Sequence, residues 1–231
     1  MGFSLDNVVP WGRSYDEYVG MFSLTTDDLA GRILGCGDGP ASFNCTLSRR
    51  GGSVLSIDPL YSFSTGEIRH RIEVTFHEVM KQVRENQDEF LWTSIGSPEV
   101  LATTRMSAMN DFLADYDKGC DEKRYVHGEL PSLPFDDNQF DLALSSHFLF
   151  LYSEQLNLEF HLASIRELCR VAADVRLFPL LELGAKRSRH LDILTSRLRK
   201  EGYGLEINSV DYEFQRGGNK MMKITSSPLK R

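Results

Sequence analysis

The chain has 231 residues, of which 41% are hydrophobic and 26% are charged, a composition typical of soluble globular proteins. Its formal net charge of −7 gives no general attraction to a phosphate backbone, so a nucleic-acid partner is not expected. No apolar run approaches the roughly 20 residues that span a bilayer, which argues against membrane insertion. We expect a single α/β domain over residues 1–231, and the sequence gives no indication of its oligomeric state.

The positions of cysteine and histidine bear on the compartment and on metal binding. The 4 cysteines contain no Cys-x-x-Cys pair, and the N-terminus lacks the basic and apolar regions of a signal peptide. We therefore expect a reduced, cytoplasmic protein. No two of the 6 histidines have the spacing of helical metal ligands, so no metal site is expected.

Short apolar runs alternate with longer stretches of helical period, the pattern of a parallel sheet with crossover helices. The first two runs, 32–34 and 53–58, flank a helix that is expected to begin at Pro40 and to end at Gly51-Gly52. The last two strands flank Gln215–Asn219 and are expected to form a hairpin. The sequence thus predicts a doubly wound, Rossmann-like, mostly parallel sheet of seven strands whose last strand is antiparallel, the later strands lying at 124–127, 140–145, 174–178, 204–214 and 220–224.

Residues 62–122, between the second and third strands, form a longer connection than a simple crossover needs. Apolar residues from Ile68 to Val83 predict one helix, and Ser97-Pro-Glu predicts the start of a second, which is expected to stop at Gly119. Two interpretations of this helical insertion stay open. It forms a lid over a binding site, or it thickens one face of the sheet.

The first strand runs directly into a glycine-rich loop. In an open parallel sheet, ligands bind beyond the carboxyl ends of the strands, and residues without side chains let a ligand approach the backbone closely. The spacing differs from the G-x-G-x-x-G of dinucleotide sites, and an acidic side chain in the loop would oppose a pyrophosphate. The loop consists of Gly35, Cys36, Gly37, Asp38 and Gly39.

These features favour S-adenosylmethionine, an adenosine that carries a sulfonium and an amino acid instead of phosphates. Asp58 ends the second strand, where its carboxylate can accept hydrogen bonds from both ribose hydroxyls. Another carboxylate, Glu129, follows the third strand.

The motifs resemble those of the class I S-adenosylmethionine-dependent methyltransferases, and the resemblance covers nearly the whole chain. It rests on the glycine loop, on Ser56-Ile-Asp58-Pro59, and on the stretch from Glu129 to Asp141 before the fourth strand. The closing hairpin is also similar to that of the family, whose seventh strand runs antiparallel. The resemblance implies methyl transfer to an acceptor, and this stretch before the fourth strand resembles the branch that acts on small molecules.

The resemblance further implies contacts for individual residues. The glycine loop, Asp58 and Pro59 would contact the cofactor, while Glu129 would meet the adenine amino group and the amide of Leu130 a ring nitrogen. The N-terminal segment 1–30 would cover the cofactor site, and its Arg13 would pair with the methionine carboxylate.

Ser145 and His147, at the end of the fourth strand, would line the methionine end of the cofactor and the acceptor site. With an ordinary pKa near 6.5, His147 is a candidate general base for a hydroxyl or amine acceptor, and the alternative is a packing or cofactor-contact role. The chain has no Asn-Pro-Pro-Tyr or Asp-Pro-Pro-Tyr box after this strand, so small metabolites are expected ahead of protein or RNA acceptors.

One position departs from the family pattern. Where the family usually has an acidic residue that holds the methionine ammonium, this chain has Ile33. Asp38, another carboxylate, or backbone carbonyls and water could take that role. The alternative is a non-catalytic, methyltransferase-like binding or scaffold module. A nicotinamide-dependent oxidoreductase is disfavoured by the loop spacing.

Overall fold

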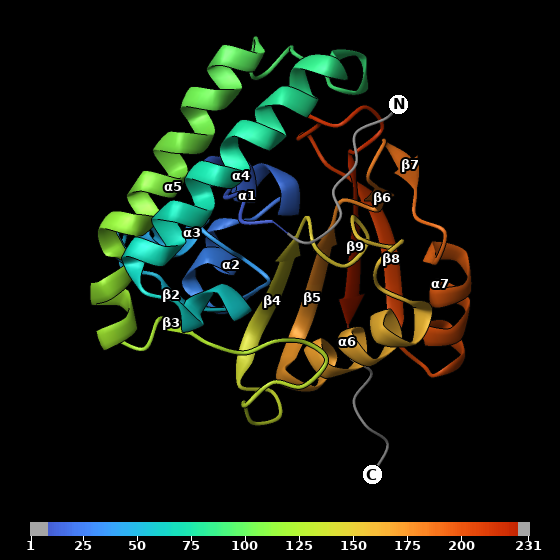
Figure 1. The fold of residues 1–231 in the computed structure, drawn as a ribbon. Coiled ribbons are helices and arrows are strands. Elements are labelled where there is room, and N and C mark those ends of the chain that lie inside the picture. The colour runs from blue at the N-terminus through green and yellow to red at the C-terminus, as the bar shows by residue number, and fades with distance from the viewer. Residues whose placement is uncertain (1–8, 226–231) are drawn as a thin grey trace.

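The computed structural model describes residues 9–225. Its centre is a seven-stranded sheet with the strand order β3-β2-β1-β4-β5-β9-β8 (Figure 1). All neighbouring strands are parallel except that β9 runs antiparallel to both β5 and β8, which confirms the predicted fold class. The strands of this sheet are β1 (Arg32–Cys36), β2 (Ser53–Ile57), β3 (Tyr125–Val126), β4 (Phe140–Ser146), β5 (Ala172–Phe178), β8 (Gly204–Ser209) and β9 (Lys220–Thr225).

Helices cover both faces of the sheet. On one face α1 and α3 pack together, and on the other α6 packs on β4, β5 and α7. No helix within residues 9–225 is long and apolar enough to cross a membrane. The helices are α1 (Tyr15–Phe22), α2 (Thr26–Ala30), α3 (Phe43–Arg49), α4 (Thr65–Glu85), α5 (Pro98–Asp121), α6 (Leu158–Val171) and α7 (Leu191–Lys200), with short 3₁₀ turns at Pro59–Ser62 and Gln87–Glu89.

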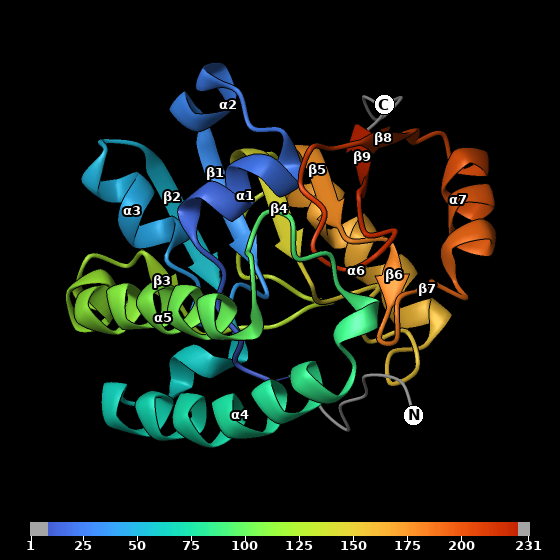
Figure 2. The same ribbon diagram turned by 90° about the horizontal axis from the view of Figure 1, so that it is seen from above.

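The insertion consists of α4 and α5, which lie side by side. Helix α5 packs on β3 and α3, and α4 packs on the outer side of α5 (Figure 2). Both helices begin at a serine whose side chain accepts a backbone hydrogen bond, Ser64 for α4 and Ser97 for α5. Their upper ends extend past the carboxyl ends of β4 and β5 (Figure 1). Helix α5 therefore thickens the sheet edge, while α4 is placed to reach over the ligand end.

The start of α3 corrects one prediction. The helix begins at Phe43, and Pro40 lies in the turn before it instead of at the first helical position. The reason is a contact with the N-terminal segment, in which Ser42 N–H donates to Arg13 O (3.0 Å). A Cβ on Gly12 would lie only 2.1 Å from Pro40 O, so the two segments touch through their backbones.

Two further boundaries were predicted wrongly. Helix α5 continues through Gly119 to Asp121, because this glycine makes room for a neighbour: a Cβ there would lie 2.3 Å from the Tyr125 ring. Strand β8 ends at Ser209 instead of 214, since the following residues turn away and bury Phe214 against α4 and α5. The sequence also did not predict a small hairpin, β6 (Leu181–Glu182) with β7 (Lys186–Arg187).

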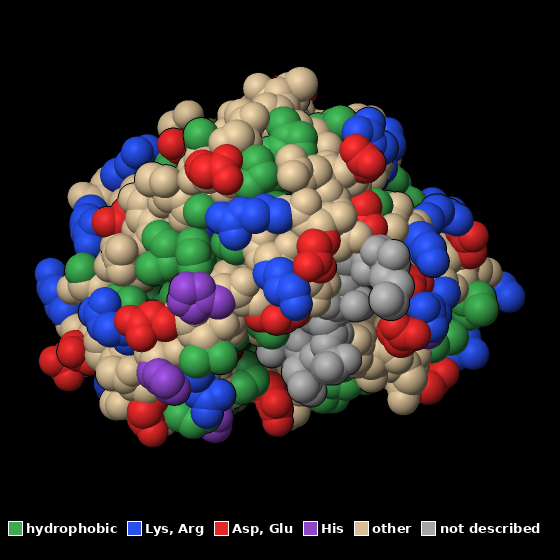
Figure 3. All heavy atoms as spheres, turned by 45° about the horizontal axis from the view of Figure 1, so that its top comes forward, with side chains coloured by type: hydrophobic (Ala, Val, Ile, Leu, Met, Phe, Trp, Pro, Cys, Tyr) green, Lys and Arg blue, Asp and Glu red, His purple; other side chains and the backbone are tan. Residues whose placement is uncertain are grey.

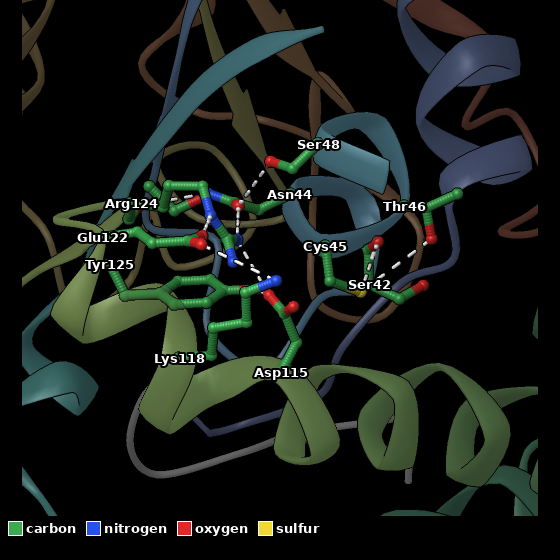
Figure 4. Close-up of polar contacts among 11 residues, drawn as sticks. Ser42, Asn44, Cys45, Thr46, Ser48, Asp115, Lys118, Glu122, Arg124 and Tyr125 are labelled. Atoms are coloured by element: carbon green, nitrogen blue, oxygen red, sulfur yellow. Dashed lines mark hydrogen bonds and ion pairs between the residues drawn. The ribbon is translucent and has the colours of Figure 1, made fainter. Parts of the chain in front are cut away.

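A polar cluster joins α5 to α3 and to the start of β3 (Figure 4). The Arg124 guanidinium donates to Asn44 Oδ1 (2.7 Å), Asp115 Oδ2 (2.8 Å) and Glu122 Oε2 (2.7 Å). Asn44 in turn donates to Ser56 Oγ on β2 (3.1 Å). The cluster therefore fixes the position of α5 against α3 and the sheet edge.

Candidate active site

A cavity of about 670 Å³ lies at the carboxyl ends of β1, β2 and β4. Its volume is within the range of roughly 300–1,000 Å³ that small-molecule sites occupy. Two of the predicted site residues, Gly35 and Ser145, do not line it. The cavity does bring together the other predicted residues: Arg13, Cys36, Gly37, Asp38, Gly39, Asp58, Pro59, Glu129, Leu130 and His147.

The glycine loop holds two left-handed backbone positions. Gly37 has φ +68° and its N–H donates to Ile57 O (3.0 Å), which ties the loop to the end of β2. A side chain on Gly37 would press on the Phe148 ring at 3.0 Å. Gly39 has φ +53° with no atom within 4 Å of its hypothetical Cβ, so this backbone is open to the cavity.

Gly35 has an indirect role. A Cβ at this position would lie 1.8 Å from Asp38 Oδ2, so the glycine leaves room for that carboxylate. Asp38 accepts hydrogen bonds from Tyr18 Oη (2.8 Å) and Ser56 Oγ (2.6 Å). Burial raises the pKa of Asp38 to about 6, with a further contribution from the charge of Asp58, although both hydrogen bonds oppose the shift.

Asp58 bridges the two loops of the site. Its Oδ2 accepts from Gly39 N–H and its Oδ1 from Leu60 N–H, both at 2.8 Å. Burial raises the pKa of Asp58, although these two hydrogen bonds favour its charged form. A carboxylate oxygen has lone pairs beyond those used here, so Asp58 retains capacity for ligand hydroxyls.

Glu129 and Leu130 follow β3 and line the cavity opposite the glycine loop. Ser132 N–H donates to Glu129 O (3.3 Å), which closes a tight turn at this point. Ser145 is buried in β4, and its hydroxyl has no hydrogen-bond partner in residues 9–225. Its neighbour Ser146 lines the cavity instead, because successive strand residues point to opposite faces.

His147 sits immediately after β4 in a left-handed conformation, with φ 52°. Its N–H donates to Phe178 O (2.6 Å), and its Nδ1 lies 2.8 Å from Ser146 Oγ. The Ser146 hydroxyl also lies 3.7 Å from Met21 Sδ. Burial lowers the pKa of His147 well below 6.5, as do two nearby arginines, so the ring is neutral at neutral pH.

These two arginines are Arg13 and Arg105, and only the first was predicted. Arg13 Nη1 donates to Trp11 O (2.6 Å), while its buried Nε has no partner within residues 9–225. Arg105 is 0% exposed and pairs with Glu17, which also accepts from Tyr212 Oη (2.8 Å). Burial would raise the pKa of Glu17, but the charge and hydrogen bond of Arg105 lower it to about 2. Burial and the charge of Arg105 lower the pKa of Arg13 to about 10.

The opposite side of the cavity is apolar and comes from segments far apart in the sequence. Val79 and Val83 lie on α4, Leu101 lies on α5, and Phe90 and Phe214 stack with ring centroids 4.8 Å apart. All five are buried in one cluster and also line the cavity. We call these five residues the helical wall. The glycine-loop wall consists of Gly37, Asp38, Gly39, Asp58 and Glu129.

The sequence pattern did not predict that the residues of the helical wall line a binding site. Val79 and Val83 lie on the helical stripe that predicted α4, and Phe214 was placed in a strand. The only signal was the length of the insertion, which suggested a lid. Among the residues that the structure describes, no group of histidine, cysteine, aspartate and glutamate side chains could hold a metal ion.

Two solved structures with similar folds are a protein from Pyrococcus horikoshii OT3, PH0226, and the magnesium protoporphyrin IX methyltransferase from Synechocystis PCC 6803 with bound S-adenosylmethionine. The first is 11% identical with a TM-score of 0.48 and covers 92% of this chain and 91% of its own. The second is 14% identical with a TM-score of 0.47 and covers 92% of this chain and 78% of its own.

The fold itself follows from the sheet. A mostly parallel sheet whose last strand, β9, runs antiparallel between β5 and β8 is the arrangement that the resemblance implied, so the chain has the class I methyltransferase fold. No family model matches the chain. The uncharacterized protein MJ0045 of Methanocaldococcus jannaschii is 33% identical over 222 residues, which cover 96% of this chain and 97% of that protein. The chain therefore belongs to the same protein family as MJ0045.

Proposed function

We propose that the protein is an S-adenosylmethionine-dependent methyltransferase that acts on a small-molecule acceptor. The observation that carries this proposal is the charge pattern around the cavity. Two carboxylates, the buried Asp38 and the half-buried Asp58, flank a glycine turn that is open to the cavity, and Arg13 presents a buried N–H without a partner in residues 9–225 at the same site. A nucleoside with a cationic sulfonium, an ammonium and a carboxylate matches this pattern.

The arginines support an anionic group in the ligand. The group formed by Arg13, Arg105 and Glu17 carries one positive charge in excess when His147 is neutral. Buried charges without partners are costly, and a ligand carboxylate would offset this one. Arg13 lines the cavity, so it would hold the methionine carboxylate, while Arg105 stays behind it on Glu17.

Asp38 is suited to replace the missing strand acid. Ile33 is buried in the core beneath α1 and does not line the cavity. Asp38 lies over Gly35 at the end of the same strand, where Tyr18 and Ser56 fix its carboxylate. It would therefore hold the methionine ammonium from the loop side.

The nucleoside would lie along the ends of β2 and β3. Asp58 would accept from the ribose hydroxyls, with Pro59 beside it, while Glu129 and Leu130 would meet the adenine. The glycine turn disfavours a nicotinamide dinucleotide, because the carboxylate of Asp38 within it would repel a pyrophosphate.

The bound cofactor supplies a methyl group that its positive sulfonium activates toward nucleophiles. The chain has to align the acceptor, exclude water and accept a proton. The His147 ring is neutral, so it has one unprotonated nitrogen, and it lines the cavity, where it would take the proton of an acceptor hydroxyl or amine. The described part of segment 1–30 and the insertion 62–122 both line the cavity and would form its cover.

A binding test with S-adenosylmethionine labelled in its methyl group addresses this proposal. We expect Arg13→Gln to weaken binding by about tenfold, the loss of one charge-assisted hydrogen bond. Arg50→Gln is the matched control, because Arg50 is exposed and stacks on the Tyr15 ring at 4.1 Å. Equal affinity of both variants would remove Arg13 from the site.

The second candidate function is a non-catalytic scaffold module, which Ile33 favours. It predicts that the wild-type protein does not bind the labelled cofactor, or binds it without turnover. Binding followed by methyl transfer to a small molecule would exclude it.

A further inference from the structure

Resting on the proposed methyl transfer, we propose that the acceptor is an uncharged, largely apolar small molecule that carries a hydrogen-bond donor. The acceptor would occupy the half of the cavity that the proposed cofactor contacts do not use. That half is bounded by the helical wall and by Gln215.

The helical wall offers a ligand only carbon surface. Its five side chains pack in one buried cluster, and the Trp92 ring lies against both aromatic members, 5.9 Å from Phe90 and 5.5 Å from Phe214 between ring centroids. Burial of apolar surface against such a wall contributes about 25 cal/mol per Å². A polar or charged acceptor would lose its hydration there without gaining partners.

Charged side chains are absent from this wall. The carboxylates among the described cavity-lining residues are Asp38, Asp58 and Glu129, all on the glycine-loop wall. Arg71 also lines the cavity, but its side chain is exposed and its guanidinium stacks 3.8 Å above the Phe63 ring. An acceptor with a positive charge would therefore find no counter-ion beside the helical wall.

Gln215 provides the polar contact in this half. It is 9% exposed and lines the cavity, and its Oε1 has no hydrogen-bond partner in residues 9–225. A buried acceptor atom without a partner is destabilising, and a hydrogen bond from a ligand N–H or O–H would remove that cost. The backbone around Gln215 is fixed, since Gly218 N–H donates to its carbonyl (2.7 Å) and it bridges to Phe90. The Gln215 amide can thus select a methyl acceptor that carries a hydrogen-bond donor.

The face over the upper ends of the strands gives no support to a nucleic-acid acceptor. Among the described residues on this face, acidic and basic side chains are interspersed with hydrophobic ones, without a continuous basic area (Figure 3). Nucleic-acid sites need clustered lysine and arginine. This observation favours a small molecule inside the cavity.

The test uses three aromatic probes of similar shape on protein saturated with S-adenosylhomocysteine. The probes are α-naphthol, which is neutral and has an O–H donor, its methyl ether, which lacks the donor, and α-naphthylmethylammonium, which is a cation. We expect one equivalent of naphthol to bind, with at least about tenfold preference over the other two. Displacement of naphthol by S-adenosylhomocysteine, or tighter binding of the cation, would overturn the proposal.

Substitutions at the helical wall and at Gln215 test whether naphthol binds beside them. Val83→Asp should weaken naphthol by at least about tenfold and favour the cation, while Val83→Thr gives a smaller loss without adding a charge to the core. The matched controls are Val74→Asp and Val74→Thr, on the same helix at a residue that is 59% exposed, and these should leave all affinities unchanged. Gln215→Leu should abolish the preference for naphthol over its ether. An unchanged preference in Gln215→Leu, or naphthol affinity that is the same in the Val83 and Val74 variants, would contradict the proposal.

Binding of S-adenosylhomocysteine and binding of naphthol test two different claims. Loss of S-adenosylhomocysteine binding with retained, Val83-dependent naphthol binding would contradict the proposed methyl transfer but not the apolar site. Retained cofactor binding without naphthol binding would contradict only this inference.

Discussion

The two walls of the cavity are built in opposite ways. The glycine-loop wall comes from the ends of adjacent parallel strands, and hydrogen bonds of 2.6–2.8 Å fix the carboxylates of Asp38 and Asp58. The helical wall comes from α4, α5, the connection between them and the segment after β8. Its side chains pack in one cluster, and backbone hydrogen bonds join the connection to the last segment, from Leu91 N–H to Phe214 O (2.7 Å) and from Arg216 N–H to Glu89 O (2.8 Å). Polar groups in the first wall are thus positioned for a defined ligand. The second wall has the adaptable chemistry of a surface that accepts related apolar shapes.

A buried ion pair connects α5, which carries Leu101 of the helical wall, to α1, whose Tyr18 donates to Asp38 of the glycine-loop wall. Arg105 on α5 pairs with Glu17 on α1, and Glu17 also accepts from Tyr212, in the segment that leads to Phe214. Removing Arg105 would leave the Glu17 carboxylate buried with only hydroxyl and backbone partners. We expect Arg105→Met to lower the free energy of unfolding by about 3–5 kcal/mol, measured by urea denaturation.

The same substitution at an exposed pair provides the control. Arg32 pairs with Asp141 at 2.8 Å, and the two side chains are 56% and 52% exposed. Arg32→Met should cost less than about 1 kcal/mol. Equal losses in the two variants would mean that the Arg105 pair does not hold the walls together.

Asp58→Ala should weaken binding of the ligand at the glycine-loop wall and leave binding of the ligand at the helical wall intact. It removes the carboxylate that holds Gly39 and Leu60 and that would meet the ribose, so we expect affinity for S-adenosylhomocysteine to fall by at least about a hundredfold. Naphthol affinity should change by less than about threefold, because the helical wall is untouched. Titration calorimetry with each ligand measures both. Unchanged cofactor affinity would exclude the ribose role.

His147→Gln should affect turnover and leave binding intact. We expect turnover on an identified acceptor to fall by about a hundredfold, with cofactor affinity unchanged, because a general base acts on the proton and not on the cofactor. His70→Gln, at an exposed position on α4, is the control.

The pH dependence of turnover tests the same residue. Since burial lowers the pKa of His147 well below 6.5, the neutral base persists from pH 8 down to 6.5, and wild-type turnover at saturating cofactor should stay level over that range. A decline centred on the ordinary histidine pKa would show that the ring is solvated and not held as described here.

Asp38 gives the smallest expected effect. Its pKa of about 6 is raised by burial, so the carboxylate is charged above pH 6 and becomes neutral below it. If it holds the methionine ammonium, affinity for S-adenosylhomocysteine is complete above pH 6 and falls by up to about tenfold per pH unit below it. Asp38→Asn should bind more weakly and show a flatter profile, whereas naphthol binding should not depend on pH in this range.

The sequence predicted the glycine-loop wall well and the helical wall poorly, for physical reasons. The glycine loop and Asp58 stand at strand ends, where local pattern alone fixes the geometry. Phe90 and Phe214 stack although 124 residues separate them, and no local pattern encodes that contact. Arg105 was also missed, because a buried arginine within a helix looks like any exposed one until its partner Glu17 is known.

The wrong boundaries have the same origin. Gly119 was interpreted as a helix stop, but it lies within α5 so that Tyr125 can pack against the helix. Pro40 was placed at a helix start, but the backbone contact with Gly12 holds it in the turn. In both cases a residue type with a strong local preference was used for a tertiary contact.

Calorimetric titration of the purified protein with S-adenosylhomocysteine, and with reduced nicotinamide dinucleotide as the comparison, tests the central claim most directly. The account predicts one site with micromolar affinity for S-adenosylhomocysteine and no binding of the dinucleotide, because Asp38 in the glycine loop opposes its pyrophosphate. Binding of the dinucleotide alone, or of neither compound, would contradict it.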